Sequence, residues 1–357
     1  MQKILVGLSG GVDSAVCAYL LKQAGYEVIG ATLRTWVSEE GQDSRCCEID
    51  DAREIADHLG IPYYVKNCMA EFRAQVTDPF ISEYIHGRTP NPCVGCNRTI
   101  KWAKMLELAD SLGAGMVATG HYATVVRREN GRFTVKQSPF AAKDQSYMLY
   151  RLTQEQLART MMPLGPLTKE EVRKIAETAG IPAAGKPDSQ EICFIPDGNY
   201  AEYIERFCEQ EIPPEGNFVD GGGRVLGRHK GITHYTIGQR KGLGLAMGVP
   251  VFVRELRPET NEVVIGSDEE LFSDTVFCRE LNFLSIEGIA PGESIPAVVR
   301  IRYHHRGEKA RIRLVSDDLA EIKFEKPVRA AAPGQAAVFY DEEGCVIGGG
   351  TITKQGR

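Results

Sequence analysis

KILVGLSGGVDS, residues 3–14, is the stretch of sequence that decides the fold of this 357-residue chain. Its first half, Lys3 to Leu8, is a continuous apolar run typical of a buried parallel strand. An apolar pattern of helical period follows and ends at Gly25, a residue type that commonly terminates helices. A glycine-rich turn between a strand and a helix aims unpaired backbone N–H groups at an anion. The stretch therefore predicts a phosphate-binding loop, with an ordinary strand-to-helix turn as the alternative.

Strands and helices alternate through the first half of the chain. The pattern predicts strands at 27–36, 61–65 and 115–119, with helices at 49–59 and 100–112 between them. This rhythm indicates an α/β fold with a doubly wound, Rossmann-like parallel sheet, which binds ligands at the carboxyl ends of its strands. We therefore expect Ser9–Ser14, Leu33–Trp36 and Gly120–His121 to line one crevice.

The sequence changes character after about residue 199. A hairpin is predicted at 122–138, and helices are predicted at 168–180, where Thr168 and Glu171 form a capping box, and at 199–208. Proline and glycine clusters follow, and from Val276 onward alternating segments indicate a small C-terminal β-barrel. We expect a catalytic domain over 1–199, a small central domain over 200–275 and a barrel domain over 276–357.

Composition limits the classes of protein that the chain can belong to. It contains no apolar run of about 18 residues, so no membrane span is predicted. It begins directly on a strand, so we expect no secretory signal, a cytoplasmic location and reduced thiols for its ten cysteines. The net charge is −6, yet residues 221–242 and 299–314 are rich in Arg and Lys. These two basic stretches favour a polyanionic partner over a solvated strand face.

The loop residues suit nucleotide chemistry. Gly10 and Gly11 allow the backbone to approach a phosphate, Ser9 and Ser14 add hydroxyl donors, and Asp13 can hold a metal ion or its waters. SGGVDS resembles the signature of the PP-loop ATP pyrophosphatases. The resemblance implies that ATP adenylates a substrate oxygen and that the loop holds the released pyrophosphate. It does not identify the nucleophile.

Two cysteine-containing segments indicate the nucleophile. In TPNPCVGCN, residues 89–97, we expect Cys96 at or just before the start of the helix over 100–112, where the helix dipole favours a thiolate. In DSQEICF, residues 188–194, the cysteine is Cys193. A core cysteine is one alternative, and a zinc site completed by Cys46 and Cys47 is another.

Seven motifs together resemble the MnmA family of tRNA-specific 2-thiouridylases: SGGVDS, TPNPCVGCN, ATGHYA, KDQSYML, DSQEICF, YTIGQRKGLG and APGQAAVFY. The resemblance implies a PP-loop domain, a central domain and a β-barrel. It implies Cys96 as the nucleophile and Cys193 as the persulfide carrier. The ATP-binding residues that it implies are Gly7, Leu8, Ser9, Gly10, Gly11, Val12, Asp13 and Ser14, flanked by Leu33 and Gly120. The tRNA-contacting residues that it implies are Asn91, Pro92, Cys93, His121, Lys143, Asp144, Gln145, Arg302, Tyr303 and Gln335.

The family activity implies ATP and Mg²⁺, the tRNAs for Lys, Glu and Gln, and a cysteine desulfurase or a sulfur-relay protein as the persulfide donor. ATP would adenylate the C2 oxygen of the wobble uridine, and sulfur transfer would end in a Cys96–Cys193 disulfide. Some members have aspartate where this chain has Cys93, so the sequence assigns no general base. Two alternatives remain: an iron–sulfur cluster on Cys93, Cys96 and Cys193, and an amide-forming PP-loop ligase that needs no cysteine.

Two further motifs carry predictions. The loop Tyr235–Gly242 is expected to contact the tRNA backbone through Arg240 and Lys241, although it could simply end a strand. The neighbouring His304 and His305 could form a metal pair. If residues 302–305 form a strand, the two rings point to opposite faces, which argues against shared ligation. We therefore expect RNA contact through Arg302 and Tyr303.

Overall fold

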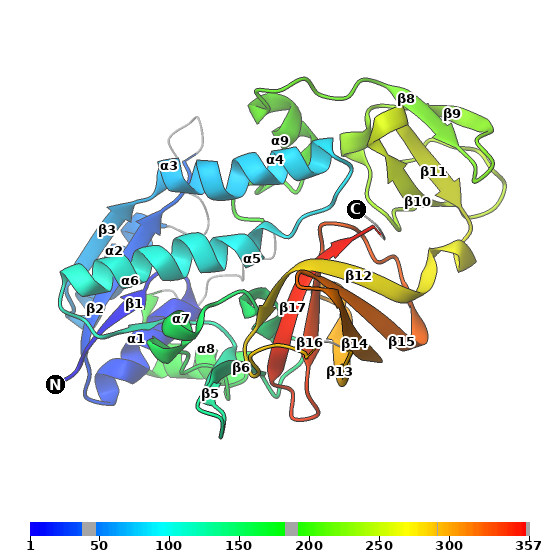
Figure 1. Cartoon of the computed structure of the whole chain (residues 1–357). Helices are drawn as coiled ribbons and strands as arrows, with labels where there is room; N and C mark the ends of the chain where they lie inside the picture. Colours follow the sequence, from blue (N-terminus) through cyan, green and yellow to red (C-terminus); the bar gives the residue numbers. More distant parts are fainter. Residues whose placement is uncertain (38–47, 183–191, 291, 355–357) are drawn as a thin grey trace.

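A computed structural model describes residues 1–37, 48–182, 192–290 and 292–354 of the chain. Figure 1 shows an α/β domain at one end, a closed β-barrel at the other and a small β-domain beside the barrel. The predicted fold class is therefore confirmed. No helix within these described ranges is both long and apolar enough to cross a membrane.

The catalytic domain is built on a parallel sheet with the strand order β3-β2-β1-β4-β7. The strands are β1 (Lys3–Gly7), β2 (Glu27–Arg34), β3 (Tyr63–Asn67), β4 (Met116–Ala118) and β7 (Thr160–Met161). One hydrophobic cluster joins the sheet to the helices α1 (Val12–Gln23), α2 (Ile49–Leu59) and α8 (Lys169–Thr178). The capping box of Thr168 and Glu171 at the start of α8 is present as predicted.

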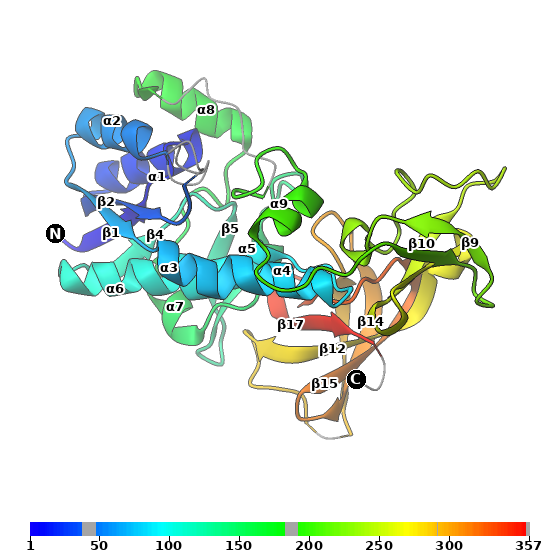
Figure 2. The same cartoon turned by 90° about the horizontal axis from the view of Figure 1, so that it is seen from above.

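Two long helices lie side by side along this domain (Figures 1 and 2). The first comprises α3 (Met69–Phe72), the π-helical turn η1 (Arg73–Thr77) and α4 (Asp78–Ile85). The second comprises α5 (Pro92–Cys96), the π-helical turn η2 (Asn97–Trp102) and α6 (Ala103–Ser111). The first was not predicted, and the second begins eight residues before the predicted Ile100 because Asn91 caps it and Pro92 suits its first turn.

The barrel is closed in the order β12-β15-β14-β13-β16-β17. Its strands are β12 (Phe272–Phe283), β13 (Ser294–Arg300), β14 (Glu308–Ser316), β15 (Leu319–Arg329), β16 (Ala336–Tyr340) and β17 (Val346–Thr353). Its connection to the catalytic domain runs through the hairpin β5 (Ala123–Arg127) and β6 (Phe133–Gln137), the short helix η3 (Ser146–Leu149) and α7 (Gln154–Ala158). Side chains of both domains form one hydrophobic cluster around Tyr147, Tyr150 and Tyr340.

The central domain is a four-stranded sheet in the order β10-β11-β8-β9. Its elements are β8 (Gly216–Val219), β9 (Val225–His229), η5 (Ile232–His234), β10 (Phe252–Arg257), η6 (Pro258–Thr260), β11 (Glu262–Gly266) and η7 (Glu269–Leu271). The sheet has a core of its own around Phe218 and Tyr235. The preceding helix α9 (Tyr200–Phe207) packs instead against α4 of the catalytic domain, where Tyr200 stacks on Tyr84.

Candidate active site

The SGGVDS loop joins β1 to α1 at the carboxyl end of the sheet, as predicted. Its two serines are linked, because Ser9 N donates to Ser14 Oγ at 3.1 Å and Ser14 Oγ donates to the carbonyl of Gly11 at 2.9 Å. Gly10 has a φ of +81°, and a Cβ there would lie 2.8 Å from the Cβ of Glu48. Glycine therefore lets this turn close tightly and leaves the first turn of α1 facing the sheet edge.

Asp13 lies in the first turn of α1, and its Oδ1 accepts two hydrogen bonds at 2.7 Å. One comes from the hydroxyl of Tyr122, just after β4, and the other from Nζ of Lys169 at the start of α8. The Lys169 ammonium is therefore within reach of any phosphate bound on the loop. Sequence reasoning did not assign either partner to the site, although Lys169 falls in the capping box that it identified.

Gly120 follows β4 and lies against the SGGVDS loop. A Cβ at this position would lie 2.7 Å from the backbone carbonyl carbon of Asp13, so the two loops touch backbone to backbone. The next residue, His121, packs its ring against Trp102 of η2 and contacts Thr119 Oγ1 through Nδ1 at 2.9 Å. Burial, aided by the positive charge of Lys101, lowers the pKa of His121 to about 3, so this ring is neutral at physiological pH.

Cys93 and Cys96 lie on α5. Asn91 is the N-cap, with its Oδ1 accepting from Cys93 N at 3.2 Å, so Cys93 is in the first turn and Cys96 follows one turn later. The prediction that Cys96 stands at a helix N-terminus is therefore wrong, because the helix begins at Pro92. The helix dipole acts most directly on Cys93, since its effect fades beyond the first turn.

Cys193 is brought to Cys96 by an aromatic cluster. Phe194, the next residue, is buried against Phe72, Phe80 and Tyr203, with ring centroids 5.1–5.7 Å apart. The same cluster contains Cys96 as a buried member and Cys193 at its edge. The fold therefore brings the two cysteines, which are far apart in the sequence, into one packing unit.

Leu33 connects the cluster that contains Cys96 and Cys193 to the carboxyl edge of the sheet, where the SGGVDS loop lies. It lies at the carboxyl end of β2 and packs against both the cysteine cluster and the core shared with the barrel. Cys68, by contrast, is fully buried in the cysteine cluster, and burial raises its pKa to about 11. Such a thiol is a poor nucleophile at neutral pH, so Cys68 is a packing residue.

A buried ion pair brings the barrel to this site. Arg300 at the end of β13 donates from Nη1 to Oδ2 of Asp144 at 2.6 Å, with side-chain exposures of 10% and 3%. The second terminal nitrogen of the guanidinium, Nη2, donates to the carbonyl of Tyr303. Burial and the Asp144 charge raise the pKa of the Tyr303 hydroxyl, and Cys93 contributes in the same direction because it lies nearby.

The segment 301–307 is a loop between β13 and β14, so the expectation of a strand at Arg302–His305 is wrong. Arg302 is exposed and Tyr303 is half-buried there. His304 packs on Tyr303, and the pKa of His305 is lowered by burial and by Arg302.

Besides Asn91 and His121, three more of the residues that the resemblance implies as tRNA contacts use their side chains within the protein. The Asp144 carboxylate accepts from Ser138 N, Ser146 N and Ser146 Oγ in addition to Arg300. Gln145 accepts from Tyr122 N at 2.9 Å, and Gln335 donates to the carbonyl of Thr89 at 2.7 Å. Lys143 is half-buried beside them.

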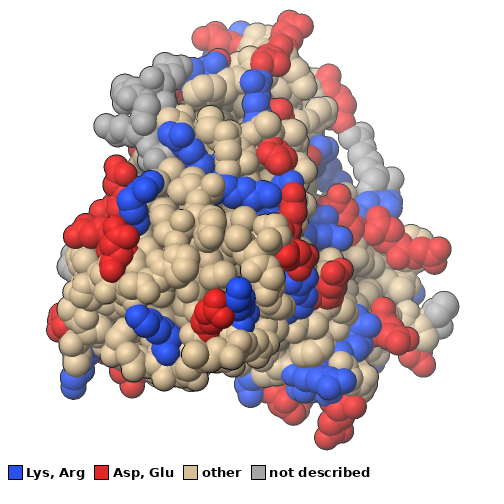
Figure 3. All heavy atoms as spheres, turned by 90° about the vertical axis from the view of Figure 1, so that its left-hand side faces the viewer, with Lys and Arg blue, Asp and Glu red and all other residues tan. Residues whose placement is uncertain are grey.

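The two predicted basic stretches are partly neutralised. Arg224 pairs with Asp220, Arg313 pairs with Glu321, and Arg300 is buried. The exposed cations of the two stretches for which no acidic partner is found within the described residues are Lys230, Arg240, Lys241, Arg302, Arg306, Lys309 and Arg311. On the catalytic-domain face in Figure 3, blue and red residues intermingle around a wide uncharged area, with no continuous basic band.

Asp13 and the three cysteines are the residues of this site that the sequence offers as metal ligands. Mg²⁺ commonly uses one or two carboxylates together with substrate phosphates, and Asp13 beside the loop fits that donor set. Within the described ranges, which contain Cys93, Cys96 and Cys193, no three His, Cys, Asp or Glu side chains are grouped to hold a metal ion. The geometry therefore gives no support to an iron–sulfur cluster on these cysteines. Cys46 and Cys47 of the zinc alternative lie outside the described residues.

Comparison with known proteins agrees with this geometry. Three family models match: the tRNA methyl transferase HUP domain at residues 2–197, the tRNA methyl transferase PRC-barrel domain at 201–267 and the aminomethyltransferase beta-barrel domain at 273–352. The chain is 55% identical to the tRNA-specific 2-thiouridylase MnmA of Lachnoclostridium phytofermentans, over 99% of this chain and 100% of the relative. It is 48% identical to the MnmA of Carboxydothermus hydrogenoformans, over 99% and 98%.

A solved structure, the U34-tRNA thiolase NcsA from Methanococcus maripaludis with its [4Fe-4S] cluster, is 18% identical. It covers 58% of this chain and 67% of its own, with a TM-score of 0.35, which is too loose a likeness to carry an argument. The full-length relatives and the matching domain families decide the assignment. The chain therefore belongs to the MnmA family of tRNA-specific 2-thiouridylases.

Proposed function

We propose that this chain is a tRNA 2-thiouridylase in which ATP activates the C2 oxygen of the wobble uridine and a cysteine persulfide supplies the sulfur. The observation that carries the proposal is the shared packing of Cys96 and Cys193 in one cluster, joined through Leu33 to the nucleotide edge. An amide-forming ligase would need neither cysteine, so it gives no reason for Cys96 and Cys193 to pack in one cluster.

The loop supplies the activation step. A uridine carbonyl is a poor electrophile because oxide is a very poor leaving group, whereas AMP leaves readily once the oxygen is adenylated. The backbone N–H groups of Gly10–Ser14 and the ammonium of Lys169, which lies beside the loop on Asp13, would stabilise the pyrophosphate that departs from ATP. Mg²⁺, held by Asp13 and the phosphates, would neutralise part of the developing charge.

The cysteines supply the transfer step. A persulfide on Cys193 carries the sulfur, and its terminal sulfur attacks C2 as AMP leaves. The Cys96 thiolate takes the inner sulfur, and the reaction ends in a Cys96–Cys193 disulfide that a reductant reopens. Alternatively, Cys96 attacks first and releases hydrosulfide, which then attacks C2. Both routes produce the same disulfide and the same 2-thiouridine, and both require a flipped-out base.

The substrates and partners follow from the same assignment. The tRNAs are those for Lys, Glu and Gln, and the persulfide comes from a cysteine desulfurase or a sulfur-relay protein, a setting that suits the cytoplasm. The exposed Arg240, Lys241, Arg302 and Arg306 are the cations that we assign to the tRNA backbone. His121, which is neutral, and Tyr303, beside Cys93, would contact bases and not phosphates.

The test is incubation of unmodified tRNA with ATP, Mg²⁺ and a persulfide donor, followed by nucleoside analysis for 2-thiouridine. Cys96→Ser and Cys193→Ser should each abolish the product, because each removes one sulfur of the final disulfide. Cys208→Ser is the matched control, since Cys208 lies in the same cluster but bonds only to the nearby Gln210 in the contacts found for it. A Cys96→Ser variant that still made 2-thiouridine would refute the mechanism.

A further inference from the structure

The segment Gly87–Asn91 joins α4 to the cysteine-bearing helix α5 and touches both other domains. Thr89 N donates to the carbonyl of Pro333 at 2.8 Å, and Nε2 of Gln335 donates to the carbonyl of Thr89 at 2.7 Å. Both backbone polar groups of Thr89 are therefore bound by the turn that leads into β16 of the barrel. A longer contact of 3.5 Å joins the Thr89 hydroxyl to Thr236 of the central domain.

Two glycines allow this close approach. Gly334, with φ at +92°, lies so near that a Cβ would stand 2.9 Å from Thr89 N and 3.0 Å from its carbonyl carbon. Gly87, with φ at +66°, faces the central domain, where a Cβ would stand 2.9 Å from Cγ of Pro258. Any larger residue at either position would push the domains apart or move the segment.

The path from Thr89 to the cysteines is short and stiff. Pro90 and Pro92 each fix their own φ near −65°, so only a few soft torsions separate the barrel-held Thr89 from the helix start. Asn91 between them caps the helix through Cys93 N. A displacement of Thr89 would therefore be passed on to Cys93 and, one turn later, to Cys96.

We propose that Gln335 is a positioning residue that acts through Thr89. By holding the Thr89 carbonyl, it fixes the helix that carries Cys93 and Cys96 relative to the barrel surface that presents Arg302 and Tyr303. The inference rests on the proposed thiolation and gives Gln335 a role in cysteine placement that is separate from any contact of its amide oxygen with tRNA. It explains why the side-chain amide of Gln335 donates to the protein's own backbone.

The test compares Gln335→Ala and Gln335→Glu with the wild-type chain in steady-state thiolation. If Gln335 positions the cysteines, kcat falls by about tenfold to a hundredfold, as expected for a misplaced reacting group, and KM for tRNA stays within about twofold. The Glu variant should be worse than the Ala variant, because a carboxylate cannot donate to a carbonyl and would repel it. A rise in KM with kcat unchanged would make Gln335 a tRNA contact and overturn the proposal.

Gln154→Ala is the matched control. Its amide also joins the catalytic domain to the barrel, donating to the carbonyls of Phe133 and Leu284 on α7's side of the interface. This variant should lose similar stability in urea yet keep kcat and KM. If Gln154→Ala and Gln335→Ala lowered kcat equally, Gln335 would have only a general structural role and the proposal would fail.

A second readout needs neither tRNA nor ATP. The rate at which iodoacetamide alkylates Cys96, followed by mass spectrometry, should change in Gln335→Ala and Gln335→Glu and stay unchanged in Gln154→Ala. An unchanged rate in all three would contradict the proposal. This readout also separates the proposed thiolation from the positioning role of Gln335. If the wild-type chain made no 2-thiouridine, the proposed function would fail, but the alkylation rates would still test whether Gln335 positions Cys96.

Discussion

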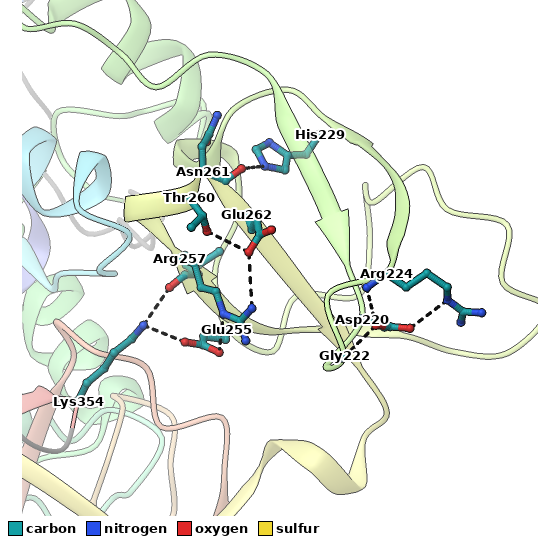
Figure 4. A network of polar contacts seen from close by, with 11 residues as sticks. Asp220, Gly222, Arg224, His229, Glu255, Arg257, Thr260, Asn261, Glu262 and Lys354 are labelled. Atoms are coloured by element: carbon teal, nitrogen blue, oxygen red, sulfur yellow. Dashed lines mark hydrogen bonds and ion pairs between the residues drawn. The ribbon is translucent and has the colours of Figure 1, made fainter.

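The barrel and the central sheet are joined to the rest of the molecule in different ways. The barrel shares one hydrophobic core with the catalytic domain, and the buried Asp144–Arg300 pair lies beside it between Tyr147 and Tyr340. The central sheet has its own core and meets the barrel through partly exposed polar contacts, such as Lys354 with Glu255. Figure 4 shows this network, in which Arg257 links Glu255 to Glu262.

The two kinds of attachment indicate different roles for the barrel and for the central sheet. A buried, hydrogen-bonded ion pair and a common core hold the barrel and the catalytic domain in one geometry. Separating them would expose apolar surface and break the buried ion pair. Exposed ion pairs exchange readily with water and contribute little. The barrel is therefore fixed against the catalytic domain, whereas the exposed ion pair between the barrel and the central sheet contributes little to holding those two parts together.

The largest effect should come from breaking the buried pair. Asp144→Leu leaves the Arg300 guanidinium buried without its carboxylate, which should lower the free energy of unfolding by about 3–5 kcal/mol. Urea denaturation measures this loss. The double variant Asp144→Leu with Arg300→Met should recover much of the lost free energy of unfolding, because it leaves no unpaired charge buried. A single variant that lost under 1 kcal/mol would refute the idea that the barrel is locked in place.

A middle-sized effect should appear as a pH dependence of the catalytic domain. The pKa of His121 is about 3 in the folded chain and near 6.5 when unfolded, so the unfolded chain binds the extra proton. Stability is therefore full above pH 6.5 and falls as the pH drops toward 3, by about 2 kcal/mol at pH 5. His121→Gln should remove this part of the slope in urea denaturation measured at pH 5 and pH 7. Parallel slopes for the two proteins would show that the ring is not held neutral.

The smallest effect should come from the contact between the barrel and the central sheet. Lys354→Met removes the bonds to Glu255 and to the carbonyl of Leu256, both at a partly exposed site. We expect a loss below about 1 kcal/mol in urea denaturation. A loss as large as that of Asp144→Leu would erase the contrast between the two attachments.

Local sequence signals predicted the elements that local chemistry controls. The turn after β1, the capping box of α8 and the alternation of the barrel strands each depend on neighbouring residues, and each was found. The start of α5 was misplaced although its signal was present, because the apolar period begins at Ile100 whereas Asn91 and Pro92 form the N-cap and first turn.

Contacts between distant residues could not be predicted in this way. Lys169 reaches Asp13, Arg300 reaches Asp144 and Gln335 reaches Thr89 only through the tertiary fold, and no local pattern marks any of these pairs. The resemblance named Asp144 and Gln335 as tRNA contacts but could not show that their side chains are bonded within the protein. The loop at Arg302–His305 was likewise misjudged, because its apolar and basic alternation matches a strand.

The π-helical turn Asn97–Trp102 gives the cysteine helix an unusual register. Such a turn holds one residue more than the α-helix needs, and one residue corresponds to about 100° of rotation. Deleting Thr99 would let the helix run straight, with Trp102 still anchored by its bond to Thr160. Cys93 and Cys96 would then rotate by about a quarter-turn relative to Trp102. The extra residue thus sets the direction in which the two cysteine side chains leave the helix, so the chain's length there matters as much as its composition.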